Sequence, residues 1–279
     1  RVIMALSELG QTHKRGAAAG YTSKLLKTGQ TTQYNDELDD GYYEKGVAKS
    51  YTVNTTGAQS GTTNVDLAHY ISGAGAISFN NTTKKITDSG SGLAIFKTND
   101  VILTSSANNP GPFTVTTGDV AGEIVCSGAT FVDETPEGAI TLYKRETISN
   151  NTVLDNNTGL IWLRYPSVKV GPDSNGKMPW TGQIYDIFAW CAACNSANVG
   201  GYNDWRIPNY FELLSLISIS SIALDSTAFP VSPNYLWTST TSRVNNSKAI
   251  YRDAYVDSQF IGKSMTDGVS CQTMLVRGG

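Results

Sequence analysis

The chain has 279 residues and a nearly balanced charge, with 21 basic and 24 acidic residues and a net charge of -3. Nucleic-acid-binding proteins usually gather a basic excess on one face, so this balance argues against a nucleic-acid partner. No apolar run approaches the ~20 residues that span a bilayer, so we expect no membrane span. Apolar residues make up 40% of the chain, which predicts a folded protein with hydrophobic cores.

The amino-acid usage favours β-structure. Thr, Ser, Asn and Gly are abundant, whereas charged residues make up only 16% of the chain. Thr and Tyr suit half-buried pleated surfaces and Asn and Gly supply turns, so we expect a β-rich protein that is extracellular or carried on a virion. Four cysteines are too few for a disulfide scaffold, and the sequence leaves open whether Cys191 or Cys194 pairs with Cys271.

The first 61 residues indicate a tail followed by a β lead-in. Residues 1 to about 27 show little periodicity, which is typical of an attachment segment. The sequence from there to residue 61 is rich in Thr, Gly, Asn and Asp and is interrupted by the alternating residues Tyr51 and Val53. This pattern predicts turns that lead into short strands.

Residues 62–147 are predicted to form a small all-β module. Short apolar segments, from Ala76–Phe79 to Ala139–Tyr143, alternate with turn signals at the spacing of a compact β-structure. No catalytic set is visible in this block. His69 stands alone, and because a metal needs several ligands, we expect a solvated histidine at a strand end.

The remaining residues, 148–279, show helical patterns as well as strand patterns. Apolar residues recur at helical spacing and predict an amphipathic helix from Gln183 to about Ala197, with Ile184, Ile187, Phe188, Cys191 and Cys194 on its inner face. Asn209 with Glu212 three residues later resembles a capping box and predicts a second helix. Three strands are expected after it, at Tyr235–Thr241, Ala249–Val256 and Thr273–Arg277.

Four ordered segments carry a family resemblance: Asp155 to Trp162 (DNNTGLIW), Asp204 to Leu214 (DWRIPNYFELL), Tyr235 to Thr241 (YLWTSTT) and Leu275 to Gly278. In order and spacing they resemble the Lcl C-terminal-type domain, which is similar to C-type lectins and to the formylglycine-generating-enzyme fold. The resemblance implies an α+β fold, in which a C-type-lectin-like domain at 148–279 has two helices plus antiparallel strands and the all-β module is an insertion. Within it, Asp204 is expected to accept backbone amides and to be clamped by Arg206, and Trp237 is expected in the core.

The residues argue against an enzyme. Ser–His–Asp and Cys–His mechanisms need a histidine base, and both histidines, His13 in the tail and His69 in the module, are badly placed. Cys191 and Cys194 form a C-x-x-C without a second pair, so we expect core cysteines and no zinc. No acidic cluster has calcium-loop spacing, and we expect no metal and no cofactor. Formylglycine-generating enzymes use paired cysteines near their C-terminus, where this chain has Cys271 alone.

A ligand-binding surface is predicted from the strand pattern after residue 249. The alternation places Tyr251, Asp253, Tyr255, Asp257 and Gln259 on one face, which we expect to be exposed, with Ile250, Ala254, Val256 and Phe260 packing inward. Tyr and Asp give large amphipathic contact areas, as in antibody paratopes. The neighbouring loop residues Ser242, Arg243, Asn245 and Asn246, with Asp267, complete the predicted site. An ordinary solvated strand face is the alternative.

The resemblance also implies a function, because domains of this type serve as variable proteins of diversity-generating retroelements, including phage receptor-binding proteins. We therefore expect a non-catalytic binding protein on a phage tail or a cell surface, with a host cell-surface glycan or protein as its ligand. The N-terminal region is expected to attach to other virion or surface proteins, and the chain to form a trimer. A structural fibre or decoration subunit is the second hypothesis, and an enzyme of the formylglycine-generating fold is the third.

Overall fold

A computed structural model describes residues 47–167, 177–217, 223–243, 245, 247–253, 260–264 and 271–278. The chain divides into two compact units, Arg1–Lys49 and Ser50–Gly279. The predicted tail and most of the lead-in lie outside the described residues. The second unit is α+β, as expected, with α-helices and antiparallel sheets.

The module consists of two small antiparallel sheets. The first has the order β2-β8-β5-β6 and contains β2 (Thr62–Ile71), β5 (Val101–Thr104), β6 (Phe113–Thr114) and β8 (Thr141–Ser149). The second has the order β3-β4-β7 and contains β3 (Ile77–Asn80), β4 (Lys85–Asp88) and β7 (Glu123–Val125). The apolar segment at Leu93–Ile95 is a 3-10 turn, η3. The sheets enclose a core of their own, with Phe96, Ile102, Ile124 and Leu142 fully buried.

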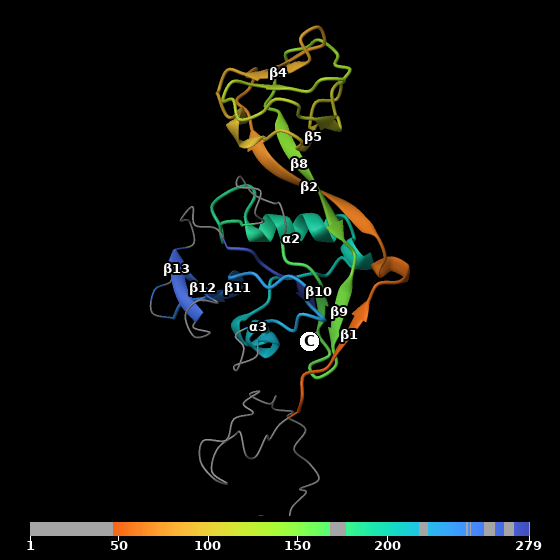
Figure 1. Cartoon of the computed structure of the whole chain (residues 1–279). Coiled ribbons are helices and arrows are strands. Elements are labelled where there is room, and N and C mark those ends of the chain that lie inside the picture. The colour runs from red at the N-terminus through yellow and green to blue at the C-terminus, as the bar shows by residue number, and fades with distance from the viewer. Residues whose placement is uncertain are drawn as a thin grey trace, which may run out of the picture. The chain divides into compact units, whose positions relative to one another are not determined.

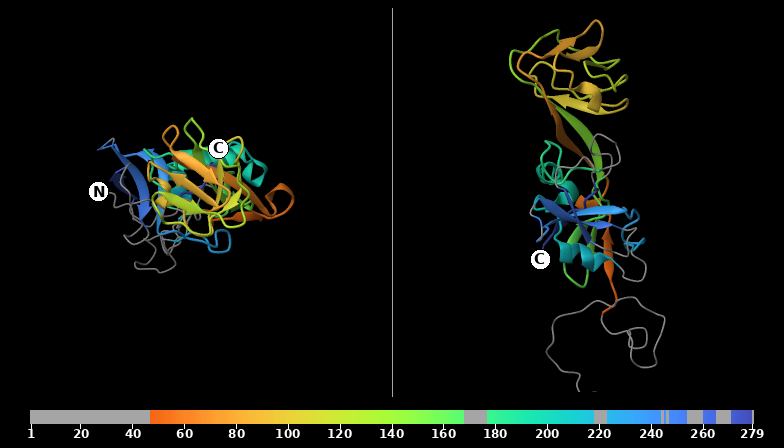
Figure 2. Two further views of the ribbon diagram at one scale, coloured as in Figure 1. Left: turned by 90° about the horizontal axis from the view of Figure 1, so that it is seen from above. Right: turned by 90° about the vertical axis from the view of Figure 1, so that its left-hand side faces the viewer.

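A long ribbon of β2 and β8 joins this core to that of the C-terminal part (Figure 1). Leu142, near the start of β8, packs in the module, whereas Ile148, near its end, packs in the C-terminal core with Leu67 of β2. The right-hand view of Figure 2 shows the two strands entering the module side by side. The boundary expected between residues 147 and 148 therefore falls inside a strand.

The module is inserted in the chain between two paired strands of the C-terminal part. Strand β1 (Tyr51–Asn54) precedes the module but pairs with β9 (Thr152–Asp155), which follows it. Together with β10 (Ile161–Leu163) and β14 (Val276–Arg277) they form a sheet with the order β1-β9-β10-β14. The short turn η2 (Gly57–Gln59) links β1 to β2. Residues 51–54 are thus part of the C-terminal sheet.

The two predicted helices are present. Helix α2 (Ile187–Ser196) begins after Asp186, whose carboxylate accepts the backbone amides of residues 188 and 189. Helix α3 (Tyr210–Leu216) has the predicted capping box. A third sheet has the order β11-β12-β13, with β11 (Tyr235–Thr241), β12 (Lys248–Asp253) and β13 (Phe260–Ser264).

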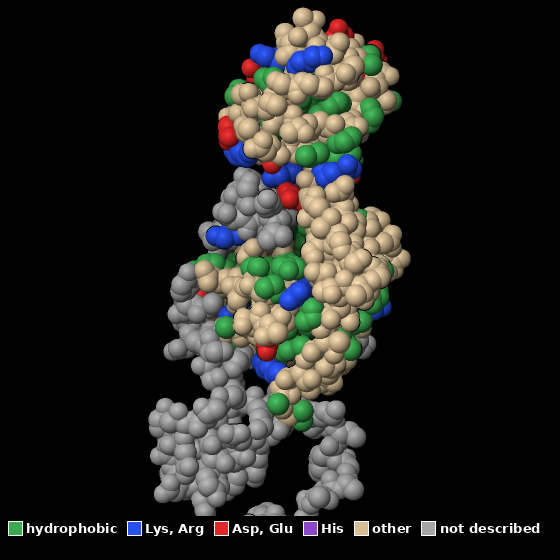
Figure 3. All heavy atoms as spheres, turned by 45° about the vertical axis from the view of Figure 1, so that its right-hand side comes forward, with side chains coloured by type: hydrophobic (Ala, Val, Ile, Leu, Met, Phe, Trp, Pro, Cys, Tyr) green, Lys and Arg blue, Asp and Glu red, His purple; other side chains and the backbone are tan. Residues whose placement is uncertain are grey.

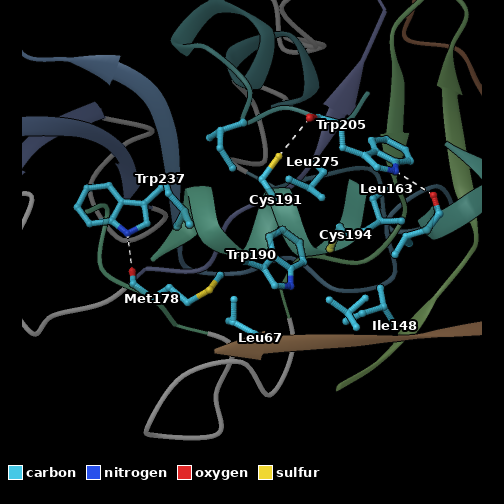
Figure 4. Packing of buried hydrophobic residues seen from close by; sticks show 14 of the residues in the cluster. Leu67, Ile148, Leu163, Met178, Trp190, Cys191, Cys194, Trp205, Trp237 and Leu275 are labelled. Atoms are coloured by element: carbon cyan, nitrogen blue, oxygen red, sulfur yellow. Dashed lines mark hydrogen bonds between the residues drawn. The ribbon is translucent and has the colours of Figure 1, made fainter. Parts of the chain in front are cut away.

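The C-terminal core is built around tryptophans (Figure 4). Trp162, Trp190 and Trp237 are fully buried, which confirms the prediction for Trp237. The Trp237 indole donates to the carbonyl oxygen of Met178 at 2.8 Å, and the Trp205 indole donates to that of Val199 at 2.9 Å. These bonds satisfy the polar edge of two large apolar side chains, so each ring is fixed in orientation as well as buried.

Candidate functional site

The segment before α3 is locked by a clamp around Glu212. Arg206 donates to both carboxylate oxygens of Glu212, at 2.6 and 2.7 Å, and to the carbonyl oxygen of Gly278 at 2.9 Å. The backbone amide of Asn209 donates to the same carboxylate at 2.8 Å. Burial would raise the pKa of Glu212, but the hydrogen bonds from Arg206 and Asn209 hold that pKa below its ordinary value.

The expected clamp between Arg206 and Asp204 is therefore wrong. Asp204 pairs instead with Arg277, whose guanidinium donates to both its carboxylate oxygens at 2.6 and 3.0 Å. Arg277 also lies over the ring of Tyr202, 4.0 Å from its centroid. The two arginines thus tie the segment from 202 to 209 to α3 and to the C-terminal strand.

A shallow groove of about 480 Å³ runs between α2, this segment and β11. The ring of Phe188 stands on its α2 side, 40% exposed, and packs edge-on against Trp180. On the floor, the Asn195 amide donates to the carbonyl oxygen of Trp205 at 2.9 Å and accepts the Trp205 amide at 2.7 Å. Ser239 and Asn209 border the opposite side.

The outer surface of α2 differs from the prediction. Ile184 and Phe188 were expected to point inward, but they are 37% and 40% exposed. The buried side chains of the helix are Ile187, Trp190, Cys191 and Cys194. Trp190 therefore lies on the inner face of the helix, where Phe188 was expected. The groove was missed because Phe188 resembled a core residue in the sequence.

The turn between β11 and β12 lies three residues along the strand from the groove. Ser242 donates its backbone amide to the carbonyl oxygen of Lys248 at 2.8 Å, which closes the turn. The Asn245 side-chain oxygen accepts the amide and the hydroxyl of Ser247, at 3.0 and 2.6 Å. Arg243 is exposed and has no hydrogen bond or ion pair within the described residues. Asn245 therefore shapes the turn, whereas the Arg243 side chain is exposed.

The predicted exposed face of β12 is wrong at its first two residues. Tyr251 and Asp253 are only 9% and 7% exposed, and they share their side of the strand with the fully buried Ala249. Tyr251 lies opposite Trp237 in the register, with the ring centroids 5.7 Å apart. Contact with Trp237 therefore turns the Tyr251 side of β12 into the core.

The other predicted binding residues lie outside the described part of the chain; these are Asn246, Tyr255, Asp257, Gln259 and Asp267. The described part of the candidate site consequently comprises the groove and residues 241–243, 245, 247 and 248 of the turn.

The thiols near the groove are buried, and burial raises their pKa. All four cysteines are free and buried, so no bridge to Cys271 is present. The Cys191 thiol donates to the carbonyl oxygen of Trp205 at 3.2 Å, and burial raises its pKa to about 12. Burial also raises the pKa of Cys194. A thiol in this environment is a poor nucleophile and a poor metal ligand.

A second hollow, of about 390 Å³, lies where the module meets the ribbon. The Lys144 side chain is 4% exposed, and its ammonium lies 3.1 Å from an Asp100 oxygen and 3.7 Å from a Glu146 oxygen. Figure 3 shows basic and acidic side chains close together where the module joins the ribbon. Lys144 is thus flanked by two carboxylates, which favours a structural role for the group.

Two further observations hold for the described residues. In that part of the chain, no helix is long and apolar enough to cross a membrane. Nor do three His, Cys, Asp or Glu side chains come together there as a metal site would require.

Comparison with known proteins gives one match. No curated protein and no solved structure is detectably similar to this chain. The family described as the Lcl C-terminal domain matches residues 151–277. This range contains both helices, the clamp, the groove and the turn, whereas β1 and the module lie outside it. Residues 151–277 are therefore an Lcl C-terminal domain.

Proposed function

We propose that this chain is a non-catalytic receptor-binding protein, a phage tail adhesin or a variable protein of a diversity-generating retroelement, with a C-type-lectin-like C-terminal domain. Its ligand is a glycan or a protein on a host cell surface. The turn that contains Arg243 and the neighbouring groove form the contact surface. The family match supports the class of protein, and the exposed Arg243 beside the groove carries the assignment of the surface.

The local chemistry supports binding over catalysis. The Cys191 thiol is held protonated by burial, and Asn195 and Glu212 use their polar atoms on the backbone and on Arg206. The imidazole of His69 is 3% exposed, so it cannot take a proton from a substrate. A rigid frame that carries an exposed polar turn suits recognition, because few groups must be ordered on binding.

The proposal is tested with the labelled 279-residue chain on a panel of bacterial cell envelopes. The substitution Arg243→Ala leaves the hydrogen bonds of Ser242 and Asn245 to hold the turn, so it removes a ligand contact without disturbing the fold. We expect saturable binding to at least one envelope and at least a tenfold loss of affinity in the variant. The matched control, Thr135→Ala with Glu137→Ala, removes exposed polar groups of the module and is expected to bind like the wild type.

Two outcomes reject this surface: equal affinity of the turn variant and the wild type, or an equal loss in the module control. A trimeric assembly is part of the same proposal, because several weak sites on one particle bind with increased avidity. Light scattering that reports a monomer would remove the trimer and leave the binding surface to be judged by the affinities.

A further inference from the structure

His69 lies at the junction of the two cores, in contrast to the solvated position predicted for it. It belongs to β2, at the register shift between Ala68 and Tyr70. Its ring is stacked on Tyr185, with centroids 5.2 Å apart and planes 16° from parallel. Tyr185 packs against the C-terminal core, and on the module side Phe96 lies 6.5 Å from the His69 ring. The imidazole therefore bridges the module and the Lcl C-terminal domain.

The hydrogen bond of the His69 ring places a proton on Nδ1 and leaves Nε2 without a partner. Its Nδ1 lies 2.9 Å from the carbonyl oxygen of Leu67, and because a carbonyl only accepts, Nδ1 carries the proton. The other nitrogen, Nε2, is buried and has no hydrogen-bond partner in the described structure. A proton added at Nε2 would place a charged N–H group against apolar atoms with no acceptor.

The charged groups around the ring do not reverse this preference. Burial lowers the pKa of His69 to about 4, with the Leu67 carbonyl opposing the shift, Lys144 of β8 adding to it and Asp100 of the module partly offsetting it. Glu146 of β8 lies 3.7 Å from the Lys144 ammonium and is a further carboxylate near this group. Tyr185, on the C-terminal side, is a neutral phenol whose pKa is raised by burial.

We propose that His69 is an acid-sensitive joint: protonation at Nε2 breaks the stack on Tyr185 and frees the module to move on the β2–β8 ribbon. We expect the C-terminal core to stay folded, because its buried residues, such as Trp190, Cys194 and Leu275, are not members of the stacked pair. Acid would thus change how the module is held relative to the binding domain, whatever ligand that domain takes.

The joint is tested by two parallel pH titrations of the full chain between pH 7 and pH 3.5. The chain contains only His13 and His69, so imidazole proton NMR resolves both, and a His13→Gln variant assigns them. We expect His69 to titrate near pH 4. Small-angle X-ray scattering should show a radius of gyration that increases with the midpoint of His69.

All five tryptophans lie at or beyond residue 162, so their fluorescence reports whether the C-terminal core stays folded. His69→Phe keeps an aromatic ring without a basic nitrogen and should stay compact throughout. If that variant does not fold, Tyr185→Leu removes the stacking partner and should be expanded already at pH 7. The proposal is overturned if the protonated wild type stays compact or if its tryptophan core unfolds together with the expansion. It is also overturned if His69→Phe expands like the wild type, or if Tyr185→Leu is as compact at pH 7 as the wild type.

Discussion

Removal of the Glu212 carboxylate should loosen the segment that borders the groove. In Glu212→Ala, Arg206 loses the carboxylate that it binds through two hydrogen bonds, and the Asn209 backbone amide loses its acceptor. The Arg206 side chain is 41% exposed, so solvent screening limits the ion pair to about 1 kcal/mol. Loss of the reciprocal cap adds about 1 kcal/mol. We expect a total loss of about 2 kcal/mol, or about 4–8 °C in Tm for a unit of this size.

Urea unfolding followed by tryptophan fluorescence measures this loss, with Glu137→Ala as an exposed control that should stay within about 0.5 kcal/mol of wild type. The pH dependence has a defined sign. Because the folded pKa of Glu212 is depressed, its contribution is complete above its unfolded value of 4.5 and is lost as pH falls through the folded pKa. A Glu212→Ala variant as stable as the control would refute the clamp.

Three further predictions concern the thiols, the buried ammonium and β1. Cys191 and Cys194 should not react with a thiol reagent at pH 8 until the protein is unfolded, when all four cysteines react; rapid native reaction would contradict their burial. Lys144→Ala removes the ammonium beside Asp100 and should cost about 3–5 kcal/mol in urea unfolding, whereas an unchanged midpoint would show that Lys144 is not the counter-charge of Asp100. Tyr51→Ala removes a half-buried ring that packs edge-on against Phe229 and should cost about 2 kcal/mol; wild-type stability would mean that β1 contributes little to the domain.

Local patterns predicted the helices and strands well. The capping box at Asn209 and Glu212 involves residues three apart, and α3 begins where the pattern places it. The strand expected at Tyr235–Thr241 has those bounds as β11. In both segments neighbouring residues alone determine the structure, because the caps and the alternation of side chains act over a few positions.

Features that depend on distant contacts were not predicted. The pairing of β1 with β9 joins residues about 100 positions apart, across the module. The side of β12 that faces inward depends on Trp237, which a pattern of alternating Tyr and Asp does not reveal. His69 is buried because Tyr185 and Phe96 converge on it from two cores. In each case the structure depends on contacts between residues that are distant in the sequence, and local patterns do not reveal such contacts.

Contact between the turn and its ligand is measured most directly by site-specific photo-crosslinking. Benzoylphenylalanine placed at Arg243, and separately at the exposed Thr135 of the module, reports which surface touches a bound partner on intact cells. We predict a ligand adduct from position 243 that is competed by unlabelled wild-type protein, and none from position 135. Adducts formed only from position 135 would contradict the account and assign recognition to the module.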